Sequence, residues 1–190
     1  MSGAQGAGKG KGGISTYGED GEPLFSIFYT SVDYIDIYLN NVLADATYYG
    51  ELLQALRGAS DYTSIKLYIN SPGGQLHTAL QIINAMRDSP ATIHATIDVE
   101  CHSAASFIFL AADTWRVTEH SFMLCHSYST GVYGKGHELA SEYHFEKERL
   151  DNLIDVYYKD FLTKKEISEL KLGRDIYLNS EEIAARLPSS

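Results

Sequence analysis

Residues 65–74 read IKLYINSPGG, an apolar stretch that runs directly into a Pro-Gly-Gly turn. Alternating branched and large apolar side chains predict a buried strand over residues 65–69. Pro72 fixes its own backbone angle, and two consecutive glycines permit a close approach that larger side chains forbid. A Gly pair between a strand and a helix can turn backbone N–H groups toward a developing negative charge, although the segment by itself favours a plain turn.

Short β-rich runs alternate with helical runs on both sides of this stretch, which is typical of an α/β domain. Strands are expected at residues 25–29, 34–39, 65–69, 92–98, 115–117 and 122–125. Helices are expected at residues 44–57, 76–87 and about 137–161, with shorter ones beginning near Thr163 and Ser180. The segment from Gly173 to Leu178 is expected to be a loop that enters a short strand.

The length and charge of the chain limit its class. Its 190 residues indicate a single domain over residues 24–190, after a flexible Gly-rich tail at residues 1–23. There are 15 Lys and Arg against 25 Asp and Glu, a net charge of −10, which argues against nucleic acid or an anionic membrane as a partner. No apolar run suits a membrane span or a signal peptide, so a cytoplasmic location is the default expectation.

The cysteines point to neither a disulfide framework nor a metal site. Cys101 and Cys125 are the only two, and their spacing is unlike that of zinc ligands. We expect two buried, reduced thiols, with no metal and no cofactor.

A second segment, residues 100–113, reads ECHSAASFIFLAAD and places two serines before an apolar helical run. Small residues around a serine at a helix start leave room for a substrate, as a nucleophile requires. Helix capping by Ser103 is the ordinary alternative. The segment is not the Gly-x-Ser-x-Gly elbow of the α/β-hydrolases.

A nucleophilic serine needs a base and an acid that orients the base. Of seven histidines, His126 is the best placed, at the end of the apolar strand FMLC, and His102 beside Ser103 is the next. Position alone selects no acid among 25 carboxylates, and Asp175 stands out only by lying in a loop next to Gly173.

Four segments follow one another along the chain: YINSPGG, SAASFIFLAAD, the strand ending at His126, and GRDIYLNSEEIAARL. Together they resemble the proteolytic subunit of the Clp protease family, ClpP, and its phage-type members in particular. The resemblance runs from about residue 34 to 187. It implies an α/β, ClpP/crotonase-like fold of stacked ββα units, with residues 137–161 as a long handle helix. Alignment with the family free of gaps, from the Gly pair onward, implies Ser103 and not Ser106 as the nucleophile, with Ser106 packing nearby.

By resemblance, His126 is the general base and Asp175 the orienting acid, and the Gly74 and Ala104 N–H groups form the oxyanion hole. The implied reaction is peptide-bond hydrolysis inside a homo-oligomeric heptameric ring or double ring. An AAA+ unfoldase would supply polypeptide substrates. The family's substrate-lining strand would follow His126.

Two other functions stay open: a catalytically weak or inactive ClpP-like assembly or regulatory subunit, and a crotonase-type acyl-CoA enzyme. Candidates at all three triad positions favour the protease over both. The chain also departs from the family. Glu100, Cys101 and His102 stand where the family typically has Gly-x-Ala before the serine, and the Gly-rich N-terminus is unlike the family's axial loops.

Overall fold

The computed structural model describes residues 12–31, 33–127 and 136–188, with the side chains of α4 described from residue 143 onward. The strands are β1 (Gly12–Tyr17), β2 (Pro23–Ser31), β3 (Tyr34–Asn40), β4 (Ser64–Ser71), β5 (Thr92–His102), β6 (Thr114–Val117), β7 (Phe122–Cys125) and β8 (Ile176–Asn179). The helices are the 3₁₀ turn η1 (Ala46–Tyr49), α1 (Gly50–Arg57), α2 (Leu76–Asp88), α3 (Ala104–Leu110), α4 (Gly136–Tyr158), α5 (Lys164–Lys171) and α6 (Ser180–Arg186). The expected α/β class is thereby confirmed.

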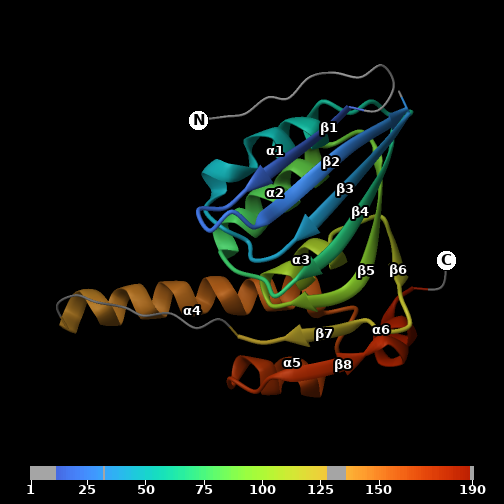
Figure 1. The fold of residues 1–190 in the computed structure, drawn as a ribbon. Coiled ribbons are helices and arrows are strands. Elements are labelled where there is room, and N and C mark those ends of the chain that lie inside the picture. The colour runs from blue at the N-terminus through green and yellow to red at the C-terminus, as the bar shows by residue number, and fades with distance from the viewer. Residues whose placement is uncertain (1–11, 32, 128–135, 189–190) are drawn as a thin grey trace.

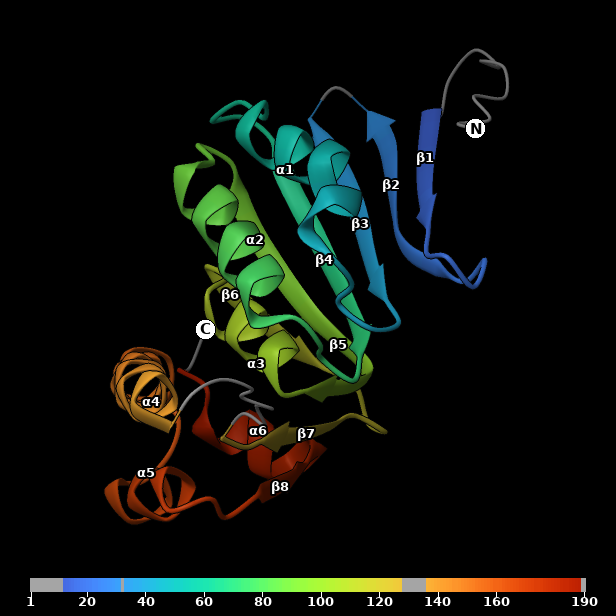
Figure 2. The ribbon, with the colours of Figure 1, turned by 90° about the vertical axis from the view of Figure 1, so that its left-hand side faces the viewer.

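All of these strands join one sheet in the order β1-β2-β3-β4-β5-β7-β8, with β6 also paired to β5. β3, β4 and β5 run parallel, joined by α1 and then α2, whereas β1, β2 and β8 are antiparallel to their neighbours. Figure 2 shows α1, α2 and α3 along one face of the sheet. The carboxyl ends of the parallel strands therefore open toward the same edge, where α/β proteins commonly place their ligands.

β5 pairs first with β6 and then, further along, with β7. The bend between these two parts of β5 sets the position of the elements that come after it. Ile97 lies opposite Val117 of β6, whereas His102 lies opposite Leu124 of β7. The register between β4 and β5 shifts in the same region, as at a β-bulge, and such a shift bends the strand. Figure 1 shows the resulting curve in β5.

The core lies between the sheet and its helices. Ile37 of β3, Ile69 of β4 and Ile97 of β5 are fully buried, and they share this layer with Ile83 of α2 and Phe109 of α3. Alternation along each strand sends the intervening side chains to the opposite face. That face carries an aromatic ladder in which Phe28, Tyr38 and Tyr68 pack ring against ring.

The long helix α4 is anchored at its C-terminal half. Leu150, Ile154 and Tyr158 recur at a four-residue spacing and are buried against the core. Tyr143 and Phe145, toward the other end, are exposed. In Figure 1, α4 projects beyond the other helices and strands. None of the helices in the described part of the chain combines the length and apolar character needed to cross a membrane.

The structure differs from the sequence expectations mainly where pairing between strands determines which residues form an element. Residues 12–17, assigned to the flexible tail, form β1 along the edge of β2. The first six residues of the expected 44–57 helix are a loop and a 3₁₀ turn, and β5 continues to His102 instead of ending at residue 98. Residues 1–11 and the expected substrate-lining stretch at 128–135 lie outside the described residues.

Two residues of β5 near the bend differ in burial, and substituting each of them tests where the bend lies. Ile97→Ala removes a fully buried side chain and should lower the free energy of unfolding by about 2–5 kcal/mol. Val99→Ala, two residues further along, removes a side chain that is 45% exposed and should change it by less than about 0.5 kcal/mol. Urea unfolding followed by circular dichroism measures both, and equal losses would contradict the placement of the bend.

Candidate active site

Ser103 forms the turn between β5 and α3. Its φ of 55° and ψ of −128° are unusual for a non-glycine residue, a backbone conformation that costs about 1–3 kcal/mol. The Ser103 N–H donates to the carbonyl of Leu124 in β7 at 2.8 Å, which ties the turn to the neighbouring strand. The Ser103 hydroxyl makes no capping hydrogen bond with the described residues of α3. The ordinary capping role of such a serine is therefore absent.

Ser106, the competing serine, belongs to the core. Its side chain has no exposed surface, and its hydroxyl bonds to the Ser103 carbonyl and to the Tyr158 hydroxyl, each at 2.6 Å. A substrate would have to displace α3 or α4 to reach it. The geometry thus matches the expectation that Ser106 packs beside the turn.

Gly73 lies directly against this turn. A Cβ at this position would lie 2.6 Å from the His102 carbonyl oxygen and 2.7 Å from the Ser103 Cβ. Its φ of 87° is also one that favours glycine. Sequence reasoning selected Gly74 and missed this contact, because the two members of a Gly-Gly pair cannot be distinguished without the fold.

Gly74 and Ala104 supply backbone donors near the same turn. Gly74 is held by a bridge to Leu43, whose N–H donates to the Gly73 carbonyl at 2.7 Å and whose carbonyl accepts from Gln75 at 2.8 Å. Neither the Gly74 nor the Ala104 N–H donates a hydrogen bond to another described residue. Both N–H groups are therefore unpaired among the described residues, as the donors of an oxyanion hole must be before a substrate binds.

Strand register brings His126 and Asp175 to the same edge. The β7–β8 ladder ends with Cys125 opposite Ile176, so the next positions along it are His126 and Asp175. On its other side β7 pairs with β5, whose next residue is Ser103. No hydrogen bond joins these three side chains among the described residues. In unliganded active sites such bonds are often too long to be counted.

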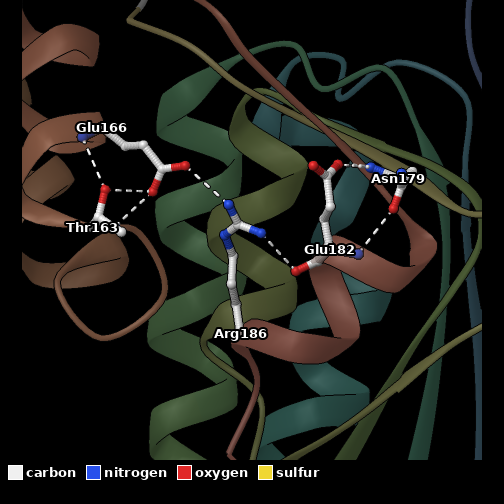
Figure 3. Close-up of polar contacts among 5 residues, drawn as sticks. All are labelled: Thr163, Glu166, Asn179, Glu182 and Arg186. Carbon is white, nitrogen blue, oxygen red and sulfur yellow. Dashed lines mark hydrogen bonds and ion pairs between the residues drawn. The ribbon is translucent and has the colours of Figure 1, made fainter.

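A polar clasp fixes β8, the strand that follows Asp175 (Figure 3). Thr163 and Glu166 form a capping box at the start of α5, and Asn179 and Glu182 form another at the start of α6. Arg186 joins the two, because it donates to the Glu166 carboxylate and to the Glu182 carbonyl, each at 2.9 Å. Burial raises the pKa of Glu166, but hydrogen bonds from Thr163 and Arg186 outweigh it and hold this pKa below its ordinary value.

A second acid–base pair lies just before Ser103. The His102 Nδ1 atom is 2.8 Å from Glu100 Oε1, and the ring packs edge-on against Phe122 at 4.8 Å. The other ring nitrogen, Nε2, is buried and has no partner among the described residues. Burial lowers the pKa of His102, Glu100 opposes this shift, and His126 adds to it. The sequence indicated the presence of these residues but not their pairing.

The two cysteines flank the site from the core side. Cys101 and Cys125 are free and fully buried, as expected. Burial raises the pKa of Cys125 to about 12, so its thiol stays protonated. The described residues contain no group of three or more His, Cys, Asp or Glu side chains arranged to hold a metal ion.

Comparisons with known proteins agree on one family. The protein-family model described as Clp protease matches residues 25–186. An ATP-dependent Clp protease proteolytic subunit from Deinococcus radiodurans is 27% identical over 120 residues, which are 62% of this chain and 59% of that protein. Subunit 1 of the same protease from Prochlorococcus marinus is 31% identical over 124 residues, 62% of each chain. The proteolytic subunit from Ostreococcus tauri is 33% identical over 147 residues, 70% of each chain.

The contact between Gly73 and Ser103 predicts a local effect of one methyl group. Gly73→Ala adds a Cβ that overlaps the Ser103 turn, and it should reduce the reactivity of Ser103 toward a fluorophosphonate by on the order of 100-fold. Gly21→Ala is the matched control, since its φ of 81° is similar but nothing lies within 4 Å of the added atom. Equal labelling rates for the two variants would contradict the close packing at Gly73.

The partly buried position of His102 predicts a pH effect on stability. Its pKa in the folded chain lies below the ordinary 6.5, so the unfolded chain binds the proton more readily. The free energy of unfolding should therefore fall as the pH drops below about 6.5, and His102→Gln should reduce that fall. Urea unfolding at about pH 8 and about pH 5 measures both proteins. An unchanged pH dependence in the variant would refute this assignment.

Proposed function

Because the chain belongs to the Clp protease family, we propose that it is a serine endopeptidase that hydrolyses peptide bonds with Ser103, His126 and Asp175. The observation that carries the proposal is the strained turn at Ser103, tied to β7 immediately before the strand end that bears His126. The alignments cover 59% and 62% of the first two relatives, so activity, substrates and partners are proposals for this chain.

In the proposed mechanism, the Ser103 hydroxyl oxygen attacks the peptide carbonyl while His126 accepts the serine proton. Asp175 orients the imidazole and stabilises its protonated form. The Gly74 and Ala104 N–H groups bind the oxyanion, and each such donor stabilises the transition state by roughly 3–4 kcal/mol. His126 then protonates the leaving amine, and water hydrolyses the acyl-enzyme by the same steps.

Two alternatives are less well supported. An inactive assembly or regulatory subunit would have no need of a strained serine turn with two available N–H donors beside it. A crotonase-type acyl-CoA enzyme shares the oxyanion geometry but does not call for a nucleophilic serine with a base and an orienting acid. The combination of Ser103, His126 and Asp175 at one sheet edge therefore favours the peptidase.

Assembly is the second part of the proposal. We infer that α4 serves as a handle and that the ββα units stack into a head, in a single domain that forms heptameric rings around a proteolytic chamber. The exposed Tyr143 and Phe145 on α4 support this, because large apolar side chains on a projecting element suit contact with another subunit. The relatives named above are ATP-dependent proteases, so a cytoplasmic AAA+ unfoldase is the proposed partner.

Covalent labelling tests the nucleophile. Ser103→Ala should abolish peptidase activity and labelling by a serine-directed fluorophosphonate, because it removes the attacking oxygen. Ser106→Ala should retain substantial labelling once the reaction is complete, even if it is labelled more slowly, since Ser103 is still present and the Ser106 hydroxyl is buried in the core. Intact-protein mass spectrometry measures both. Labelling that survives in the first variant and vanishes in the second would reverse the assignment.

Sedimentation of the same samples tests the chamber. The labelled chain should sediment as a ring or a double ring. A monomer at micromolar concentration that still cleaves peptides would exclude enclosure of the site.

A further inference from the structure

A chain of buried hydroxyl groups connects α4 to the Ser103 turn. The Tyr158 hydroxyl lies 2.6 Å from the Ser106 hydroxyl, which lies 2.6 Å from the Ser103 carbonyl oxygen. Both side chains have no exposed surface. The Tyr158 ring packs against Phe107, with ring centres 5.0 Å apart, so its hydroxyl is held in place by the core.

The direction of these bonds follows from the number of protons. Ser106 has one hydroxyl proton, and the bond to the Ser103 carbonyl uses it. Tyr158 must therefore donate to Ser106, which accepts through a lone pair. The Ser103 carbonyl accepts twice, from the Ser106 hydroxyl and from the Ser106 N–H at 3.0 Å. Each bond polarises the next and strengthens the chain.

These bonds act on the most strained part of the site. Ser103 keeps its φ of 55° only because the surrounding contacts prevent relaxation. On its N-terminal side the restraint is the bond to the Leu124 carbonyl, and on its C-terminal side the restraint is Ser106. Without the Ser106 hydroxyl, the Ser103 carbonyl keeps only the bond from the Ser106 N–H. The peptide after Ser103, which carries the Ala104 N–H, is then held less firmly.

Tyr158 also contacts the strand that bears the candidate base. The Cys125 thiol lies beside its hydroxyl, and Cys125 immediately precedes His126. One side chain from α4 thus reaches the Ser103 carbonyl through Ser106, and it also lies beside the residue that precedes His126.

We propose that Tyr158 is a positioning residue, which acts through the Ser106 hydroxyl to hold the Ser103 carbonyl and the Ala104 N–H in reactive geometry. This inference rests on the proposed function of Ser103 as a nucleophile. It adds a role for α4 in catalysis that is separate from any role in assembly.

Three variants test the inference by steady-state kinetics on a short fluorogenic peptide and by the rate of fluorophosphonate labelling. Tyr158→Phe keeps the ring and removes the donor, and Ser106→Ala removes the hydroxyl bond to the Ser103 carbonyl while keeping the bond from the backbone N–H. Each should lower kcat and the labelling rate by on the order of 10-fold to 100-fold, with KM changed by less than about twofold. The double variant should match Ser106→Ala alone, because Tyr158 acts through Ser106.

Ser121→Ala is the matched control. Its hydroxyl is equally buried and donates to the Ile97 carbonyl at 2.9 Å, but it does not contact the Ser103 turn. This variant should lose thermal stability to an extent similar to Ser106→Ala while keeping the wild-type kcat and labelling rate.

The outcomes separate this inference from the proposed function. Wild-type kinetics for Tyr158→Phe, or multiplicative losses in the double variant, would overturn the positioning role while leaving the nucleophile intact. A loss of kcat in Ser121→Ala equal to that in Ser106→Ala would overturn it too, because the effect would then be one of stability. If labelling of the wild-type chain does not depend on Ser103, the proposed function itself fails.

Discussion

The hydrogen bond from the Ser103 N–H to the Leu124 carbonyl joins the two strands that carry the candidate nucleophile and base. It requires that β5 end beside β7, and β5 reaches β7 only because it bends away from β6. The turn at this point has a positive φ, and the residue there is a serine, where glycine would be less strained. The neighbouring Gly73 lacks a side chain, and this absence makes room for the turn.

The sheet and the helices around the turn carry out different tasks. The parallel strands and α1 to α3 form an apolar core that fixes where β5 ends. The elements after β7 supply the rest of the site: Asp175 lies just before β8, and Tyr158 of α4 reaches the turn from the core. This division explains why a buried polar network lies where the two groups of elements meet. There, hydrogen bonds fix direction as well as distance.

Local patterns in the sequence predicted most helices and strands. The elements that they missed depend on pairing between strands. The strand Phe122–Cys125 and the capping box at Thr163 depend on neighbouring residues, so both were found from the sequence. The strand β1 was missed because a glycine-rich segment forms a strand only where an edge such as that of β2 accepts it. Position in the sequence selected His126, whereas resemblance to a family selected Ser103 over Ser106 and picked out Asp175. Strand register places all three directly after or before paired strand ends. The contacts of Gly73 and Tyr158 depend on packing between distant segments, which no local pattern encodes.

The clasp centred on Arg186 has a consequence for local unfolding. Because one guanidinium joins the capping boxes of α5 and α6, the segment from Thr163 to Arg186 is expected to open as a single cooperative unit instead of fraying helix by helix. Asp175 lies within that unit, so any opening withdraws the proposed acid from the proposed base, His126, in one step. The population of catalytically competent molecules would then follow the stability of this C-terminal segment, even while the apolar core of the sheet remains folded.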